Sequence, residues 1–303
     1  AFFFIMLPVK IGLQLSVSPY TWGFELTPFL ITAYFIIMML FASWCFLKFS
    51  KDVAIGIILF SIFIYFGLTN MPWLPLILIY GLIGFKIGGL KLSLTIVASF
   101  LFITFTGVLP QALLSIYLCG IAVIISFILG SSLGIWAAHN DKVSAFMRPI
   151  NDTMQTMPSF VILIPFVMFF GIGEFTALLA IIAYAFVPAM RYTEHGLRNL
   201  PETVIEAARM IGCSQAQLLW KVKIPLAMPV IMLGLNQTIM FGLAMLVIAA
   251  LVGTTGLGQL IYIGLSKADF GTGMISGVSI ALIAIIFDRT TQAWRIKLEK
   301  KTQ

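Results

Sequence analysis

Long apolar runs separated by short polar segments make up most of the chain. A helix needs roughly 20 apolar residues to cross about 30 Å of hydrocarbon, and these runs are continuous rather than alternating as in barrel strands. The pattern therefore predicts an all-α polytopic membrane protein. Nine membrane-spanning helices are expected, near residues 27–47, 53–69, 72–85, 92–109, 112–137, 157–171, 175–190, 226–250 and 273–287. Residues 1–24 are interrupted by Pro8 and Lys10 and are expected to lie at the membrane surface.

The composition agrees with a chain that is surrounded by lipid. Hydrophobic residues make up 61% of the chain, charged residues make up 10%, and the mean hydropathy is +1.09. A soluble domain could not cover its surface with so few charges. Cys45, Cys119 and Cys213 show no CxxC spacing and are interpreted as packing residues.

The basic residues are distributed unevenly between the two sides of the expected spans. Sixteen of the 18 lysine and arginine residues fall in one set of alternate gaps, and only Lys10 and Lys267 fall in the other. Because positively charged loops stay in the cytoplasm, the basic side is predicted to be cytoplasmic. The C-terminus and the long polar gap 191–225 then lie inside, and residues 1–26 lie outside.

The gap 191–225 carries the signals of a short helix that ends in a tight turn. Asn199 precedes Glu202 by three residues, which is the spacing of a capping box, and Pro201 suits a first helical turn. Gly212 can adopt the left-handed conformation that ends a helix. The sequence therefore predicts a helix followed by a glycine turn.

A second helix is predicted directly after the turn. Ser214 and Gln217 form another capping-box pattern, and Pro225 marks the expected start of the next span. Such an elbow can contact a cytoplasmic partner, or it can rest on the lipid headgroups as basic amphipathic loops do.

The residues of this gap resemble the EAA signature of permease subunits of ABC importers. That signature reads EAA, three residues, Gly, nine residues and then Ile-x-Leu-Pro. The matching positions are Glu206, Ala207, Ala208, Gly212, Val222, Ile224 and Pro225, with Val222 and Ile224 as conservative departures. In that family the loop is a coupling helix that docks in a groove of a separate ATP-binding subunit. The resemblance therefore implies such a partner, with ATP and Mg²⁺ bound there and no cofactor in this chain.

Three further segments closely resemble the permeases for glycine betaine and proline betaine. They are "MQTMPSFVILIPFVMFFGIG" (154–173), "LNQTIMFGLAMLVIAALVGTTGLGQ" (235–259) and "IFDRTTQAW" (286–294). The resemblance covers about residues 110–294. It implies a substrate such as glycine betaine, with proline betaine, carnitine, choline and trimethylamine N-oxide as alternatives, and it leaves an osmotic or a nutritional role open.

The resemblance also implies how the chain is organised. A five-helix permease core is expected at 110–290, with the coupling loop 191–225 inside it and a basic cytoplasmic tail at 291–303. Residues 1–109 resemble the family only loosely and are expected to be accessory helices. The family further implies a homodimer in a bacterial inner membrane, supplied with solute by an extracytoplasmic substrate-binding protein.

Motifs for enzymatic chemistry are absent from the sequence. It contains no GxxxxGK[ST] phosphate loop, no HExxH and no Gly-x-Ser-x-Gly, and His139 and His195 both fall in polar gaps. A transport subunit without catalytic residues is therefore predicted. No span interior carries a clear charged residue, which argues against a proton-driven carrier. A sodium site made of carbonyl groups would leave no such trace, so an ion-coupled transporter or channel is the alternative, and a membrane scaffold is a third.

A polar solute needs a lined path through the spans. Asn236, Gln237 and Thr238 are polar residues in an otherwise apolar span, and Ser159 and Phe160 lie in a span interrupted by proline. These five residues are the candidates for the path. Amides also hold membrane helices together, so interhelical packing is the alternative for Asn236 and Gln237. The glycine-rich stretch 253–259 is expected to be an external loop.

Overall fold

The computed structural model describes the backbone of residues 73–302 and the side chains of residues 77–298. The chain divides into two compact units, residues 1–76 and 77–303, and the described helices belong almost entirely to the second. Three predicted segments lie outside the described residues: the surface segment 1–24 and the spans 27–47 and 53–69.

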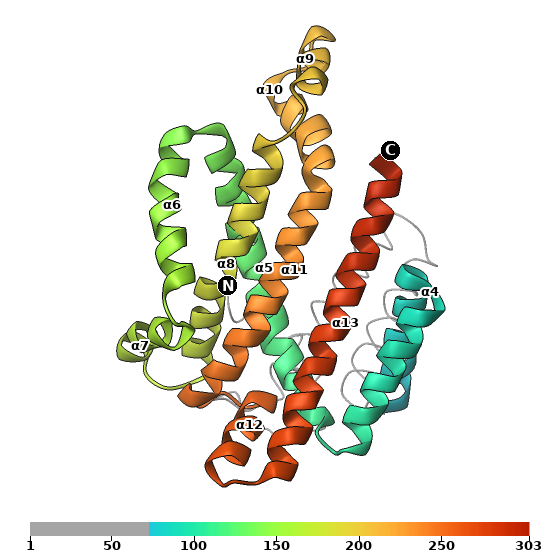
Figure 1. Ribbon diagram of the computed structural model, residues 1–303, viewed down its shortest axis with the longest axis vertical. Coiled ribbons are helices and arrows are strands. Elements are labelled where there is room, and N and C mark those ends of the chain that lie inside the picture. The colour runs from blue at the N-terminus through green and yellow to red at the C-terminus, as the bar shows by residue number, and fades with distance from the viewer. Residues whose placement is uncertain (1–72, 303) are drawn as a thin grey trace, which may run out of the picture. The chain divides into compact units, whose positions relative to one another are not determined.

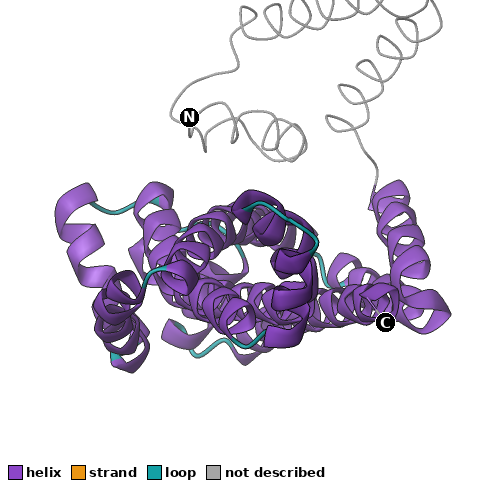
Figure 2. Ribbon diagram, turned by 90° about the horizontal axis from the view of Figure 1, so that it is seen from above, coloured by secondary structure: helices purple, strands orange, loops and turns teal. Residues whose placement is uncertain are grey.

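Helices joined by short loops make up the part of the chain that the structure describes, and no strand occurs there (Figure 2). Five of them are long and apolar enough to cross a membrane, and a sixth span results if two bent helices are counted together. The elements are α4 (Trp73–Phe105), α5 (Leu109–His139), α6 (Asp141–Thr156), α7 (Ser159–Phe170), α8 (Glu174–Arg198), α9 (Glu202–Met210), α10 (Gln215–Gln217), the π-helix η2 (Leu218–Lys223), α11 (Ile224–Ala249), the 3₁₀-helix η3 (Ala250–Val252), α12 (Leu257–Ser266) and α13 (Phe270–Thr302). The prediction of an all-helical membrane protein is confirmed.

The first described helix, α4, is a hairpin of two arms. The chain reverses at Gly89, where φ is +75°. The rings of Tyr80 and Phe100 then stack with centroids 5.1 Å apart, and the Ser93 hydroxyl donates to the Gly81 carbonyl at 2.9 Å. The arms correspond to the predicted spans 72–85 and 92–109, and each is about 24 Å long at 1.5 Å per residue.

Helices α5, α8 and α11 form the centre of the bundle and pack closely. A Cβ atom added to Gly130 would lie 2.6 Å from the Phe186 carbonyl oxygen, and one added to Gly134 would lie 2.6 Å from the Met190 carbonyl oxygen. Glycines spaced four apart let helix backbones approach, as small residues do at many membrane helix contacts. This stripe on α5 therefore fixes how α8 lies against it.

Several helices extend beyond the predicted spans. The span predicted at 226–250 belongs to a continuous helical segment from Gln215 to Val252, and that predicted at 273–287 belongs to α13. Hydropathy marks only the apolar part of a helix, while polar residues such as Gln217 and Gln292 continue the same hydrogen-bonded ladder. Asp288 is therefore inside a helix rather than at its end.

The span predicted at 157–171 is too short by itself. Helix α7 has 12 residues, and it meets α6 at an angle of 103° across a break at residues 157–158. The residues of the polar helix α6 fall in the gap between two predicted spans, and the structure shows that they form a helix packed against α8. Pro158 explains the break, because proline disfavours a helical conformation in the residue before it.

The loops gather at two ends of the bundle. The short helices α9 and α10 project at one end, where the C-terminal end of α13 also lies, and α12 lies at the other end (Figure 1). The polar elbow is therefore placed as a projection from the bundle.

Candidate functional site

The projecting elbow, residues 199–223, begins with α9 and turns at Gly212. The Gly212 amide donates to the Arg209 carbonyl at 2.9 Å, and the Cys213 amide donates to the Ala208 carbonyl at 3.2 Å. This pair of bonds is a Schellman motif, in which the residue after the C-cap adopts positive φ. Gly212 has φ +86°, so the predicted glycine turn is confirmed.

One of the two predicted capping boxes is wrong. Pro201 occupies the N-cap of α9 and makes no side-chain cap. The Asn199 amide instead donates to the His195 carbonyl at 2.9 Å, because it belongs to the end of α8. Asn199 therefore closes one helix rather than opening the next.

The second capping box is confirmed and starts the other half of the elbow. The Ser214 hydroxyl accepts from the Gln217 amide at 3.3 Å, and the Gln217 side chain accepts from the Ser214 amide at 3.0 Å. The chain then passes through η2 into α11 without a break. Pro225 is the second residue of α11, directly after the π-helical turns of η2, and the helical segment continues through it.

The surface of the elbow combines exposed acidic and apolar groups. Glu206 and Ala207 are exposed, while Ala208 packs inward. Met210 and Ile211 are 90% and 84% exposed at the tip of the turn. Exposed apolar side chains on a projecting elbow favour contact with a partner protein or with the lipid headgroups. The sequence carried the signal, an apolar pair just before Gly212 in a polar segment, but it was not singled out.

An apolar cluster holds the elbow to the bundle. Leu197 on α8 and Ala227 and Ile231 on α11 are buried together. A Cβ atom added to Gly196 would lie 3.0 Å from Cβ of Val230, so the two helices lie close where the elbow leaves and returns. Leu218 of η2 is also buried, with 1% exposure.

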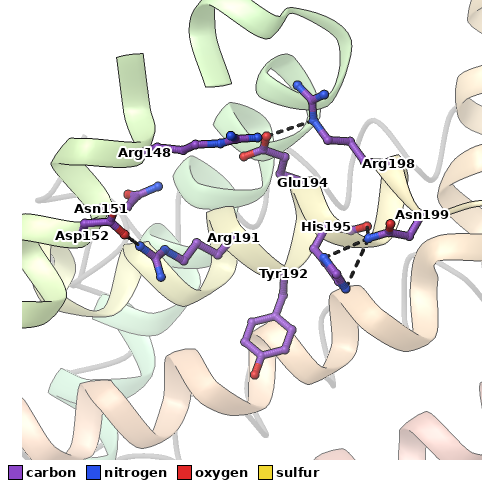
Figure 3. A pocket seen from close by; sticks show the side chains of 9 residues that line it. All are labelled: Arg148, Asn151, Asp152, Arg191, Tyr192, Glu194, His195, Arg198 and Asn199. Atoms are coloured by element: carbon purple, nitrogen blue, oxygen red, sulfur yellow. Dashed lines mark hydrogen bonds and ion pairs between the residues drawn. The ribbon is translucent and has the colours of Figure 1, made fainter. Parts of the chain in front are cut away.

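A network of charged groups ties α8 to α6 beside this apolar cluster. Figure 3 shows its Arg198–Glu194 bond and the neighbouring Arg191–Asp152 pair. Arg198 donates through Nε to Glu194 Oε1 at 3.0 Å and through Nη1 to Asp141 Oδ1 at 2.8 Å. Its Nη2 also donates to the Ala137 carbonyl at 2.6 Å, and the Ser144 hydroxyl donates to Glu194 at 2.5 Å. The last turn of α8 is thereby joined to the end of α5 and the start of α6.

The network borders an open polar cavity of about 510 Å³. Arg191 forms an ion pair with Asp152 across the cavity, and both side chains are partly exposed. Asn151 is 2% exposed and donates to the Met190 sulfur at 3.3 Å. Helix α6, which lies between two predicted spans, contributes Asp152 and Asn151 to this cavity.

Asn236 links two helices inside the bundle. Its Nδ2 donates to Asp288 Oδ1 at 2.8 Å, and its Oδ1 accepts from the Thr291 hydroxyl at 2.7 Å. Gln292 also donates to Asp288 at 2.8 Å. These contacts favour the packing alternative for Asn236, because its amide is occupied by α13. They also join two of the sequence segments that resembled the same family.

The other path candidates on α11 differ in their hydrogen bonding. Thr238 is fully buried and donates to the Gly234 carbonyl at 2.8 Å. Gln237 is half-buried, and within the described residues no hydrogen bond engages its amide. One turn along, the Phe241 ring stacks on Tyr184 of α8 with centroids 5.1 Å apart. Gln237 thus has open donors and acceptors beside a half-buried aromatic pair.

Ser159 and Phe160 lie at the start of α7. Ser159 is half-buried and Phe160 is 52% exposed. Phe160 lines an apolar groove of about 310 Å³ between α7 and η3. The structure thus places these two path candidates on α7 and the other three on α11.

The glycine-rich stretch is shorter as a loop than expected. Leu257 begins α12, and its amide donates to the Ser115 hydroxyl at 2.9 Å. Thr255 donates to Glu174 at 2.7 Å, and Thr254 is 2% exposed. The stretch is packed against α5 and α8, and its last three residues belong to α12 rather than to a loop.

Comparison with known families shows what this arrangement is. Residues 130–294 match the family of binding-protein-dependent transport system inner membrane components, which is more than half of the chain. The chain belongs to this permease family. The matched range contains the elbow, the apolar cluster that holds it to the bundle and the Asn236–Asp288 contact.

Several relatives of the permease carry names for related solutes. It is 40% identical over 226 residues to the glycine betaine/proline betaine transport system permease protein ProW of Escherichia coli, covering 75% of this chain and 64% of that protein. It is 36% identical to the glycine betaine permease OpuAB of Bacillus subtilis, covering 87% of this chain and 94% of that protein. It is 42% identical to the trimethylamine N-oxide permease TmoV of Pelagibacter ubique, covering 74% of this chain and 31% of that protein. The chain therefore spans less than two thirds of the first and the third.

Solved structures show the same fold. The inward-facing MetNI methionine ABC transporter aligns with a TM-score of 0.56 and 18% identity, covering 63% of this permease and 95% of the matched chain. An amino acid ABC transporter with histidines aligns with a TM-score of 0.54 and 17% identity, covering 65% of the permease and 98% of that chain. The bundle is thus an ABC permease fold.

Proposed function

We propose that this chain is the membrane-spanning permease subunit of an ATP-driven importer for glycine betaine or a related quaternary amine. The observation that carries the proposal is the projecting elbow, which presents the EAA-like residues on a helix closed by a Schellman turn. Relatives named for glycine betaine, carnitine and trimethylamine N-oxide support this class of solute. Glycine betaine is the leading solute.

The elbow is the docking site of a cytoplasmic ATP-binding subunit. Met210 and Ile211 supply apolar area that a groove in the partner would remove from water, and Glu206 supplies a charge for orientation. ATP and Mg²⁺ bind on the partner, and hydrolysis takes place there. The permease itself has a mechanical role.

Movement of the elbow reaches the bundle through Arg198. This guanidinium contacts the ends of α5, α6 and α8 together, and α6 continues through the 103° bend into α7. A shift of α8 driven from the elbow therefore displaces α6 and α7. Such a displacement opens or closes the path on one side.

We propose that the chain has the membrane topology that its sequence predicts. Nine spans place residues 1–26 outside and the C-terminus in the cytoplasm of a bacterial cell, with residues 110–290 as the core, 1–109 as accessory helices and 291–303 as a basic tail. The elbow and the C-terminal end of α13 lie at the same end of the bundle, which supports one common side for the basic segments (Figure 1). The sequence contains one EAA-like segment, so two copies of the chain would offer two docking sites to a symmetric ATPase pair. A substrate-binding protein delivers the solute from outside.

The solute path runs beside Gln237. Its open amide can hydrogen-bond a carboxylate, and the faces of Tyr184 and Phe241 can attract a trimethylammonium group through cation–π interaction. Ser159 and Phe160 belong to the same path at α7. Asn236 and Thr238 support it by holding α11 in position.

Reconstitution tests the proposal. The purified chain is placed in liposomes with its ATP-binding subunit and its substrate-binding protein, and uptake of radiolabelled glycine betaine is measured with and without ATP. We expect uptake only when all three components and ATP are present. Uptake driven by an ion gradient without the ATPase would instead establish a secondary transporter or channel.

Substitutions in the elbow test the docking site. Met210→Ser with Ile211→Ser should weaken binding of the ATP-binding subunit by about 30-fold, which corresponds to about 2 kcal/mol of lost contact. Glu206→Lys should abolish stimulated ATP hydrolysis while membrane insertion is unchanged. Met274→Ser, which changes a 73% exposed methionine near the start of α13, is the matched control and should bind normally. Normal ATPase stimulation in the elbow variants would contradict the proposal.

A further inference from the structure

The second arm of α4 and the second half of α13 enclose a groove that the proposed transport mechanism does not use. It has a volume of about 370 Å³, and its lining includes Lys91, Thr95, Ile285, Arg289, Gln292 and Ile296. Gly88, at the hairpin tip, approaches Ala293 closely, since an added Cβ would lie 3.3 Å from its Cβ atom. The Lys297 ammonium donates to the Lys86 carbonyl. The groove is therefore closed at its hairpin end by direct contacts.

Two exposed basic side chains in this groove have no acidic partner among the residues that the structure describes. Within the described residues no ion pair or hydrogen bond engages the Lys91 ammonium or the Arg289 guanidinium. The ion pairs of the described residues all lie within α8 or between α8 and α6. Asp288, the nearest carboxylate along α13, accepts from Asn236 and Gln292. The local charge of the groove is therefore positive.

The helical repeat explains why one segment serves two different contacts. In the segment 286–294, Asp288 and Thr291 point toward α11 and bond Asn236, while Arg289 and Ala293 face α4. Residues four apart lie on one face of a helix, so Ile285, Arg289 and Ala293 form a single stripe along the groove. Arg289 is thus held on the side opposite to the packing contact.

We propose that this groove binds the headgroup of an anionic phospholipid, with the phosphodiester between Lys91 and Arg289. Basic pockets between membrane helices attract anionic headgroups, and a guanidinium offers two parallel donors to phosphate oxygens. Exposed apolar side chains flank the groove, among them Leu94 on α4, which is 59% exposed, and Ile285 on α13, which is 43% exposed. They provide an apolar surface for acyl chains. A soluble anion has no acyl chains, so this surface favours a lipid as the ligand. The lipid would fasten the α4 hairpin to the core at α13.

Lipid retention by the purified full chain tests this site. The chain is exchanged into nanodiscs of phosphatidylcholine and phosphatidylglycerol, released, and analysed by native mass spectrometry for retained lipid of each class. We expect a preference for phosphatidylglycerol that falls about five-fold for Lys91→Gln or Arg289→Gln alone and about 30-fold for both. Five-fold corresponds to the attraction of about 1 kcal/mol between one basic residue and anionic lipid. Lys267→Gln, an exposed lysine between α12 and α13, should retain the preference.

Three results would overturn the proposal. The double variant could keep the same preference for phosphatidylglycerol as the unchanged chain. It could also lose phosphatidylcholine and phosphatidylglycerol equally, which would show that the two basic charges do not cause the preference. Radiolabelled inorganic phosphate could bind the detergent-solubilised chain saturably and be lost in the double variant while no lipid preference exists, which would make the ligand a soluble anion. A circular dichroism melt of each variant accompanies the measurement, and Arg289→Lys with Lys91→Arg should restore retention in a folded chain if the proposal holds.

Discussion

Two polar clusters hold this bundle together, and they differ in their access to water. Around Arg198 the groups are charged and one side of the network is open to water, with the side chains of Asp141, Arg198 and Glu194 91%, 30% and 12% exposed. Around Asn236 the groups are buried, with Asn236 at 9% and Thr291 at 7% exposure. Exposed ion pairs exchange their partners for water at small cost, whereas buried polar groups lose much when one partner is removed. The first cluster therefore suits a joint that moves, and the second suits a joint that stays closed.

The buried cluster should show the largest effect on stability. Asn236→Leu removes two buried hydrogen bonds, one of them to the Asp288 carboxylate, and we expect the free energy of unfolding to fall by about 2 kcal/mol. Asp288 keeps its bond from Gln292, and the Thr291 hydroxyl keeps its bond to the Phe287 carbonyl. Thermal unfolding in detergent measures the loss. Gln237→Leu is the matched control, since this neighbouring amide has no hydrogen bond within the described residues, and its effect should stay within about 0.5 kcal/mol. Equal losses in the two variants would show that the contacts of Asn236 do not stabilise the bundle.

Arg198→Gln should have an intermediate effect that depends on salt. The substitution removes bonds to Glu194, Asp141 and the Ala137 carbonyl, and we expect a loss of about 1 kcal/mol at low ionic strength. The loss should shrink in 1 M salt because mobile ions screen exposed charges. Unfolding curves at both salt concentrations test this, and a salt-independent loss would mean that the network is not exposed in the membrane. Under the proposed mechanism, the Arg198→Gln variant should lose solute uptake even under conditions in which it remains folded.

The single ion pair across the polar cavity should show the smallest effect. Asp152→Asn removes the partner of Arg191, and the cost should be at most about 0.5 kcal/mol because both side chains are open to solvent. A double-mutant cycle with Arg191→Gln measures the coupling. A coupling energy above about 2 kcal/mol would show that this pair is buried in the assembled protein.

The main helices could be predicted from the sequence because long apolar runs have few alternatives. The Ser214 box and the Gly212 turn were also predictable, since each depends on contacts within a few residues. The partner of Asn236 was not, because Asp288 and Thr291 lie 52 and 55 residues away along the chain. Helix α6 was missed for another reason: its polar residues bond α8, and hydropathy cannot distinguish a helix satisfied by a neighbour from one in water.

The unbroken helical segment from Gln215 to Val252 turns a local contact into a distant displacement. Its 38 residues would extend about 57 Å, with one end in the elbow and the other beside the groove at α7. A tilt of about 10° around its midpoint moves each tip by about 5 Å, which is one helical turn. A displacement of the exposed end in one direction therefore moves the opposite end of the helix in the other direction.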